Sequence, residues 1–332
     1  MSKPKVAIFG ASGRIGQAQV RQLLKQGFPV VAVTRNKSVL DRPEFDGAEI
    51  VSADLGDRDS IRQVLENVYA AFFQLPSFGS PLDTINYAKN MAEAASAVKL
   101  TRLVHNSTMW SPDNPPCGEP TYDHVRVVED VFLNSDVPTV VVRPVLFMDN
   151  LVTNLVKPSI VEDGIYRYVQ RPGLEADLIS MDDTARYMIE ALQRADLTGK
   201  RILLGGPERL PVEQVVATLS EVMGKPLKFE YLPAPQYGEY VFNKVYPGFG
   251  PDPAPIVAFF DSFYTFNNFS PEKPFEMDVD ELNKLIPLKT ETFREWASKQ
   301  DWTSLPEKGT VGSVAGQNER RAVESRMREF DR

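Results

Sequence analysis

Tyr122 and Arg126 are the two side chains whose types and spacing most directly suggest acid–base chemistry. They stand four residues apart in Tyr122-Asp-His-Val-Arg126, so a helix would place them one turn apart on one face. A tyrosine hydroxyl can protonate a carbonyl oxygen, and a fixed cation beside it lowers its pKa. A proton-donating role for Tyr122 is what a family resemblance, described below with its residues, implies for such a pair. The alternative is that Tyr122 starts a helix and its hydroxyl only lines a pocket.

The spacing alone is a weak signal. The chain has 11 tyrosines and 37 lysines and arginines, which give about 1.2 chance matches to Tyr-x-x-x-Lys/Arg. A second match, Tyr240 with Lys244, is present. Location after a predicted strand is therefore what favours Tyr122.

Further polar side chains lie near Tyr122 in the order of predicted elements. Ser107 follows a predicted strand over 102–106, and its hydroxyl could orient a carbonyl or simply begin a turn. His124 is a second candidate acid, because histidine changes its charge near neutral pH. His105 is expected to be an ordinary strand residue.

Three glycines at three-residue spacing predict a phosphate-binding turn. Gly10-Ala-Ser-Gly-Arg-Ile-Gly16 joins a predicted strand to a predicted helix. Such a turn offers free backbone N–H groups at a helix N-terminus to a pyrophosphate. The first gap is one residue longer than in Gly-x-Gly-x-x-Gly. The expected cofactor-binding residues of this turn are Gly10, Ser12, Gly13, Arg14, Ile15 and Gly16.

Arg35 indicates which dinucleotide would bind. The second predicted strand ends in Thr34-Arg35-Asn36-Lys37, and the next acidic residue, Asp41, is too distant to hold a ribose hydroxyl. A 2′-phosphate needs a cation, whereas a free 2′-hydroxyl is usually held by a carboxylate. Arg35 therefore predicts NADP(H), with Arg14 or Lys37 as helpers. The alternative is a solvated arginine without a ligand.

The ends of two more predicted strands complete the expected cofactor site. Asp54 and Leu55 follow the third strand, where such folds bracket the adenine, although Asp54 could equally be a turn residue. Gln74, Leu75 and Pro76 end the fourth strand and are expected beside the ribose and nicotinamide.

Alternating strands and helices must position these residues. Strands are predicted over 5–9, 28–34, 48–52, 70–75, 102–106, 139–143 and 201–204; helices over 17–25, from Asp57, and over 82–98, 122–134, 182–192, 212–223 and 292–299. The strands are continuous apolar runs, as in parallel sheets covered on both faces. The sequence predicts an α/β fold, a doubly wound parallel Rossmann sheet with a smaller C-terminal substrate-binding region.

The predicted domains follow from this pattern. Residues 1–155 form the dinucleotide-binding domain, whose sheet is completed by about 176–206. Residues 156–175 and 207–303 form the substrate-binding region, and 304–332 form a polar tail that is expected to be flexible. Eleven aromatic residues lie between Tyr237 and Phe269. They predict either a loop-rich layer packed by its own aromatics or a wall over an apolar pocket.

Composition excludes several classes of function. The formal net charge is −8, without a basic concentration that would favour nucleic acid. One cysteine and two histidines argue against a metal site. The N-terminus enters a strand at once, and no apolar run could span a bilayer. We expect a cytoplasmic protein without a signal peptide, nucleic acid or membrane partner; a homodimer stays open.

Four segments resemble the NmrA-like branch of the atypical short-chain dehydrogenase/reductases. They are Gly-Ala-Ser-Gly-Arg-Ile-Gly (10–16), Val-Thr-Arg-Asn (33–36), Val-Glu-Asp-Val-Phe-Leu-Asn-Ser (128–135) and Val-Arg-Pro-Val-Leu-Phe-Met-Asp-Asn (142–150). The resemblance covers about residues 5–300. It implies that Pro144 and Phe147 line the nicotinamide end of the cofactor. Family members include NADPH-dependent reductases of ketones, quinones, enones and dyes, and also regulators that bind the dinucleotide without turnover.

One departure from the enzymes of this family bears on catalysis. Typical short-chain reductases carry a lysine four residues after the tyrosine. Here Arg126 stands there, and an alignment on Glu129 and Ser135 puts Val125 at the lysine position of many NmrA-like enzymes. The sequence predicts an NADP(H)-dependent reductase of a hydrophobic or aromatic ketone, quinone or enone. The alternative is a non-catalytic NADP(H) sensor that binds a protein partner.

Overall fold

The computed structural model describes residues 3–76, 80–245 and 252–306. It forms two compact units, each described here by itself. The first contains residues 1–144, 181–204 and 280–288, and the second contains 145–180, 205–279 and 289–332. Of the tail predicted over 304–332, residues 307–332 lie outside the described residues.

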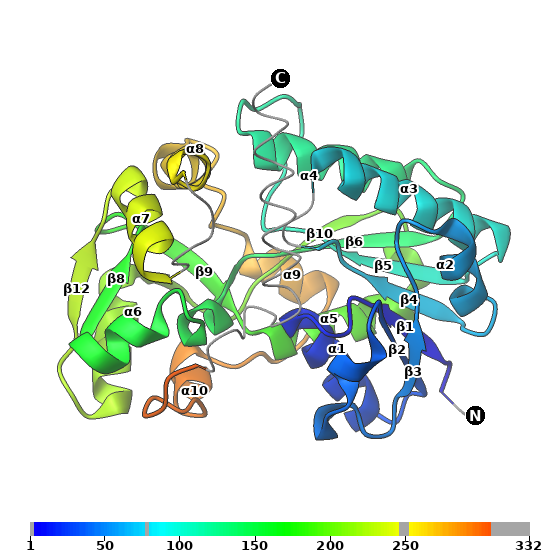
Figure 1. Cartoon of the computed structure of the whole chain (residues 1–332), viewed down its shortest axis with the longest axis horizontal. Helices are drawn as coiled ribbons and strands as arrows, with labels where there is room; N and C mark the ends of the chain where they lie inside the picture. Colours follow the sequence, from blue (N-terminus) through cyan, green and yellow to red (C-terminus); the bar gives the residue numbers. More distant parts are fainter. Residues whose placement is uncertain (1–2, 77–79, 246–251, 307–332) are drawn as a thin grey trace. The chain divides into compact units, whose positions relative to one another are not determined.

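A seven-stranded sheet is the centre of the first unit, with strand order β10-β6-β5-β4-β1-β2-β3 (Figure 1). All neighbouring strands run parallel. The strands are β1 (Val6–Phe9), β2 (Val30–Thr34), β3 (Glu49–Ser52), β4 (Ala70–Phe73), β5 (Arg102–Asn106), β6 (Thr139–Pro144) and β10 (Arg201–Leu204). The predicted doubly wound fold is confirmed. The order reverses direction between β1 and β4, which is where such sheets bind ligands at their carboxyl edge.

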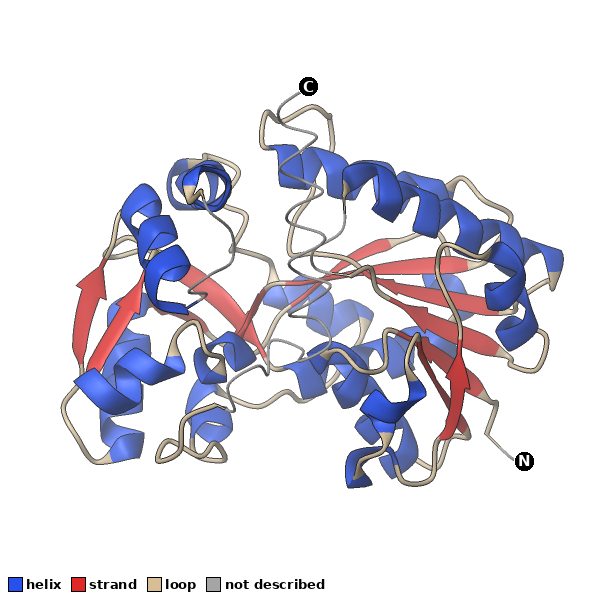
Figure 2. Cartoon of the chain, viewed as in Figure 1, coloured by secondary structure: helices blue, strands red, loops and turns tan. Residues whose placement is uncertain are grey.

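Helices cover both faces of this sheet because its central strands are buried from end to end. α1 (Arg14–Lys25) packs beside α5 (Met181–Gln193), while α2 (Arg58–Leu65), α3 (Pro81–Ala97) and α4 (Pro120–Leu133) form a row (Figure 2). α9 (Val279–Leu285) contributes residues from 280 onward. Between the sheet and the row of helices, Phe73 packs against Phe9, His105 and Phe132.

Helix ends follow local capping chemistry. Asp57 accepts hydrogen bonds from the backbone of Asp59 and Ser60 and caps α2, as its position predicts. Ser80 caps α3 in the same way. α5 begins at Met181, one residue before the predicted start, so neither Asp182 nor Asp183 caps the helix and both carboxylates lie inside its first turn. They still favour that helix end electrostatically.

Short sheets and helices build the second unit. β9 (Glu175–Ile179) pairs with β7 (Leu146–Phe147) and β11 (Arg209–Pro211), and β8 (Ile165–Tyr168) pairs in parallel with β12 (Lys228–Tyr231). The helices are α6 (Val212–Met223), α7 (Ala234–Tyr240), α8 (Ala254–Phe269) and α10 (Phe293–Ala297). α10 begins with a capping box between Thr292 and Glu295.

The described residues between Tyr237 and Phe269 are largely helical, so the first of the two alternatives for this region, a loop-rich layer, does not describe its secondary structure. The buried residues of α8 are Phe260, Asn267 and Asn268. Asn268 accepts a hydrogen bond from the Arg171 backbone N–H and donates one to the Val169 carbonyl. Polar residues thus occupy the inward face, while Phe259 and Phe269 are exposed. This mixture hides the apolar periodicity that would have indicated a helix.

Candidate functional site

The turn between β1 and α1 has the backbone geometry that its glycines predict. Gly10 has φ +80°, a conformation that side chains disfavour. A Cβ on Gly16 would overlap the carbonyl oxygen of Gly10, whereas a Cβ on Gly13 would lie 3.3 Å from that oxygen. Gly13 is the N-cap of α1, and no side chain caps the helix. No capping side chain therefore occupies the N-terminus of α1, the end of a helix at which anions bind.

Gln74 locks the end of β4 to this turn. Its buried side chain donates a hydrogen bond to the Gly10 carbonyl (3.3 Å) and accepts one from Gln19 of α1 (3.0 Å). Leu75 is half-buried and Pro76 is exposed. Gln74 thus supports the glycine turn itself, a role that its place at the end of a strand did not indicate.

Arg35 follows β2 and is exposed. Within the described ranges no carboxylate forms an ion pair with it, and Ser52 donates a hydrogen bond to its backbone carbonyl (3.1 Å). Lys37 begins a short 3₁₀ helix capped by Asn36. An exposed cation without a carboxylate partner is available to an anionic ligand.

Tyr87 of α3 is a neighbour of this region that the sequence analysis missed. Burial raises its pKa, Asp83 and Asp54 raise it further, and Arg35 lowers it. The Tyr87 ring lies near Asp54, because a Cβ on Gly56 would be 3.9 Å from the ring and 3.3 Å from the Asp54 carboxylate. The Asp54 carboxylate accepts from the Gly56 N–H (2.8 Å) and so forms a turn. Leu55 packs on the core, and its carbonyl accepts from Asn90.

Tyr122 lies in the first turn of α4, and its side chain is fully buried. Its ring meets Trp110 edge-on at 5.1 Å between centroids, and Glu119 caps its backbone N–H. Arg126 is held by the Asp130 carboxylate and by the backbone carbonyls of Pro112 and Asp113. The Arg126 guanidinium is therefore already engaged in hydrogen bonds that hold the loop before α4.

The two histidines have different surroundings. His124 shares a 2.7 Å hydrogen bond with Thr84 and links α4 to α3. His105 is buried between Phe73 and Phe132, with Nδ1 3.2 Å from the Phe73 carbonyl oxygen. Burial lowers the pKa of His105 to about 4, against the opposing effect of Glu129. His105 is a neutral strand residue, as predicted.

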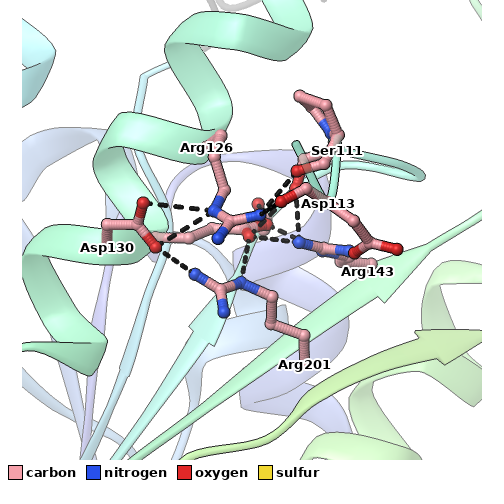
Figure 3. A network of polar contacts seen from close by, with 9 residues as sticks. Ser111, Asp113, Arg126, Asp130, Arg143 and Arg201 are labelled. Carbon is pink, nitrogen blue, oxygen red and sulfur yellow. Dashed lines mark hydrogen bonds and ion pairs between the residues drawn. The ribbon is translucent and has the colours of Figure 1, made fainter. Parts of the chain in front are cut away.

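Glu129 of α4 is the centre of a buried polar network that the sequence analysis did not predict. Figure 3 shows this network, with Ser111, Arg143 and Arg201 among the labelled residues. Oε1 accepts from Ser107 (2.7 Å) and Arg143 Nε (2.9 Å). Oε2 accepts from Ser111 (3.2 Å), Arg143 Nη2 (2.5 Å) and Arg201 Nε (2.9 Å). Arg201 also pairs with Asp130. The network joins the carboxyl end of β5 to β6, β10 and α4.

The charge state of Glu129 follows from these partners. Burial by itself would raise the pKa of its carboxyl, but Arg143, Ser107 and Arg201 outweigh burial and leave that pKa below its ordinary value. Glu129 is therefore ionised at neutral pH and can only accept hydrogen bonds. The signal in the sequence was its presence in the segment 128–135, together with arginines at strand positions 143 and 201.

Pro144 and Phe147 belong to different units. Pro144 ends β6 and pairs in register with Leu204, whereas Phe147 ends β7 of the second unit. Phe147 lines a cavity of about 20 Å³ with residues that include Tyr166, Tyr168 and Gln170, room for about one water molecule. Tyr168 also packs on Tyr237 and Tyr264. The aromatic side chains of this unit therefore pack against one another and fill much of the space between them.

The described residues contain no helix long and apolar enough to cross a membrane. In the same residues, no group of histidine, cysteine and acidic side chains is arranged to hold a metal ion.

Comparison with known proteins places these features in context. The model of the NmrA-like family matches residues 2–297. The chain is 29% identical over 229 residues to a (4-alkanoyl-5-oxo-2,5-dihydrofuran-3-yl)methyl phosphate reductase of Streptomyces griseus subsp. griseus, covering 68% of this chain and 77% of the relative.

Two solved structures share the fold. One is an NADPH-dependent quinone oxidoreductase of Escherichia coli complexed with NADPH, with TM-score 0.71, 21% identity, and coverage of 88% of this chain and 98% of that chain. The other is the triphenylmethane reductase of Citrobacter sp. complexed with NADP(H), with TM-score 0.72, 19% identity, and coverage of 89% and 99%.

Proposed function

The chain belongs to the NmrA-like family, and on this premise we propose that it is an NADP(H)-dependent oxidoreductase. Its substrate is a hydrophobic small molecule with a ketone, quinone or enone group. The reductase named among its relatives and the quinone and dye reductases that share its fold support this proposal. The assignment of a ketone, quinone or enone group to the substrate rests on the chemistry expected of the site.

One observation carries the cofactor assignment: a glycine turn without a side-chain cap follows β1, and Arg35, exposed and without an ion pair among the described residues, follows the adjacent strand β2. The turn suits a pyrophosphate, because the N–H groups and dipole of α1 favour anions. Arg35 suits a 2′-phosphate, because a guanidinium makes charge-assisted hydrogen bonds to phosphate oxygens. The residues present therefore fit NADP(H).

The remaining cofactor contacts are assigned from the neighbouring strand ends. Ser12, Arg14 and Ile15 accompany the glycines, and Asp54 and Leu55 lie toward the adenine. Gln74, Leu75 and Pro76 lie toward the ribose, and Pro144 and Phe147 toward the nicotinamide. NADPH supplies a hydride from its nicotinamide C4, and the chain's task is to hold ring and substrate in a reactive orientation.

Proton supply is assigned to Tyr122, with His124 or water as the alternatives. Tyr122 is buried against Trp110, so its hydroxyl would have to donate its proton from a position inside the protein. Arg126 lies one helical turn after Tyr122, but its guanidinium is paired with the Asp130 carboxylate. This pairing reduces the electrostatic effect of Arg126 on the tyrosine hydroxyl. Orientation is therefore expected to contribute more to the rate than acid catalysis.

A second candidate function has specific support. Neither Arg126, engaged by Asp130, nor Val125 supplies the lysine of typical short-chain reductases. The lack of this lysine favours a protein that binds NADP(H) without turnover and signals cofactor binding to a protein partner. Both functions require the same cofactor site.

Consumption of NADPH across a panel of ketones, quinones and enones separates the two. The reductase should oxidise NADPH with at least one hydrophobic member of the panel and accept NADH poorly. A protein that binds NADPH tightly and consumes none with any member would be the sensor.

A further inference from the structure

Ser107 presents its hydroxyl in one defined orientation. Its backbone N–H donates to the Val142 carbonyl (2.8 Å), which ties the residue to β6. Its hydroxyl donates to Glu129 Oε1 (2.7 Å). The backbone and the hydroxyl of Ser107 are thus both held by hydrogen bonds to groups of the protein itself.

The direction of the Ser107 hydrogen bond is set by its partner. Glu129 is fully buried and contacts Arg143 and Arg201, and an ionised carboxylate has no proton to give. The single hydroxyl proton of Ser107 must therefore point to Glu129. What remains on Ser107 is an oxygen with free lone pairs, an acceptor.

Ser111 shows the contrast. It also donates to Glu129, but Arg143 Nη2 donates to its oxygen, and the residue is buried. Ser107 is half-buried, and nothing in the described part of the chain donates to its hydroxyl oxygen. One serine of the pair is satisfied within the protein, and the other keeps an acceptor at the protein surface.

Ser107 lies directly after β5, at the carboxyl edge of the sheet. β5 is the neighbour of β4, whose end contacts the glycine turn through Gln74. Ligands of doubly wound sheets bind along this edge. The acceptor therefore lies at the edge of the sheet where the cofactor and substrate are expected.

We propose that Glu129 positions Ser107 as a hydrogen-bond acceptor toward the bound ligand, and that the group it holds is an N–H or O–H donor rather than a carbonyl oxygen. Resting on the proposed function, we assign that donor to the carboxamide NH₂ of the nicotinamide. A hydroxyl or amide on the substrate has the same chemistry. Glu129 is a positioning residue, and Ser107 makes the contact. This reverses the carbonyl-orienting role that the sequence suggested for Ser107.

The test compares NADP⁺ with its 3-acetylpyridine analogue, which keeps the carbonyl and lacks the NH₂. Calorimetric titration of wild-type protein should give a several-fold lower Kd for NADP⁺, as expected for one hydrogen bond. Ser107→Ala should weaken NADP⁺ binding about fivefold to tenfold and leave the analogue unchanged. Ser107→Thr, which keeps the hydroxyl, should restore the discrimination.

Ser111→Ala is the matched control, because it removes the other serine hydroxyl on Glu129. It should lower the melting temperature about as much as Ser107→Ala and keep the discrimination between the two dinucleotides. If Ser107→Ala leaves both Kd values unchanged but raises KM only for substrates with a donor group, the acceptor is confirmed and its ligand is the substrate.

Two results would overturn the inference: equal weakening of NADP⁺ and the analogue by Ser107→Ala, or no effect on either dinucleotide or any substrate. Failure of wild-type protein to bind NADP⁺ at all would instead contradict the proposed function. The two failures are therefore distinguishable.

Discussion

At the scale of single residues, charge decides which dinucleotide the chain can hold. Arg35 is exposed and has no carboxylate partner in the described ranges, so its charge is not neutralised within the protein. A cation of this kind discriminates for a 2′-phosphate by charge-assisted hydrogen bonding. Cofactor preference is therefore expected to depend on this one side chain more than on the glycine turn, which is proposed to hold the pyrophosphate that both dinucleotides share.

Arg35→Asp should weaken NADPH binding by at least about tenfold, because repulsion replaces a charge-assisted contact. NADH binding should change little. Fluorescence titration with both cofactors measures this. Lys25→Asp makes the same charge change at the opposite end of α1 and should leave both affinities unaltered. Equal affinity of the wild type for NADPH and NADH would remove the basis of the Arg35 assignment.

Tyr122→Phe removes a hydroxyl and little volume, so fold and NADPH affinity should survive. If Tyr122 is the proton donor, ketone turnover should fall by roughly 10² to 10⁴, the usual contribution of a general acid. Tyr240→Phe, in the other Tyr-x-x-x-Lys match, is the control and should keep full turnover. A loss below about tenfold with an unchanged pH profile would assign the proton to water or His124.

His105 makes stability depend on pH. Its folded pKa of about 4 lies below the ordinary 6.5, so the unfolded chain binds more protons between these values. The neutral form stabilises the fold above about pH 6.5, and about 3 kcal/mol is lost as pH falls to 4. Denaturant unfolding of His105→Asn should lack this part of the decline. An identical pH dependence in wild type and variant would show that His105 does not contribute.

At the scale of elements, the three glycines of the turn have separable roles. A Cβ on Gly16 would overlap the backbone of Gly10, whereas one on Gly13 meets only a contact at 3.3 Å. Gly16 is therefore required for the close approach of α1 to β1. Gly13 faces the expected phosphates.

Gly16→Ala should lower the free energy of unfolding by about 3 kcal/mol or more, since backbone must move. Gly13→Ala should cost about 1 kcal/mol or less and still weaken NADPH binding. Chemical denaturation and NADPH titration of both variants measure the two effects. Similar stability losses in both would mean that the turn relaxes around a Cβ at either place.

The elements also show what the sequence could predict. β5, β10 and α6 have the predicted bounds, because apolar runs and helical periodicity reported burial directly. α8 was missed because its buried face includes Asn267 and Asn268. Gln74 and Arg35 could be placed at strand ends from the pattern, but the Glu129 network joins residues 107, 111, 129, 143 and 201. Its members are brought together only by strand order, which local patterns do not contain.

At the scale of the whole molecule, the chain divides its tasks between two units. The first holds the sheet, the glycine turn and the Glu129 network, and the second gathers aromatic side chains around a small cavity. Under the proposed function, the aromatic side chains of the second unit favour a hydrophobic substrate. A homodimer stays an open possibility.

Removal of residues 307–332 should leave NADPH affinity within about twofold and the melting temperature within a few degrees. The segment is polar and charged, so it offers little apolar area to bury. Titration and thermal unfolding of the shortened chain measure this. Loss of NADPH binding on truncation would make the segment part of the folded site.

Under the proposed function the chain transfers hydride from NADPH to a hydrophobic carbonyl or enone compound. Transfer of deuterium from NADPH labelled on one face of C4, followed by mass spectrometry of the product, tests this transfer most directly. We expect one deuterium in the product for each NADPH oxidised, from one of the two labelled forms only. Tight binding of NADPH without oxidation by any compound of the panel would contradict it.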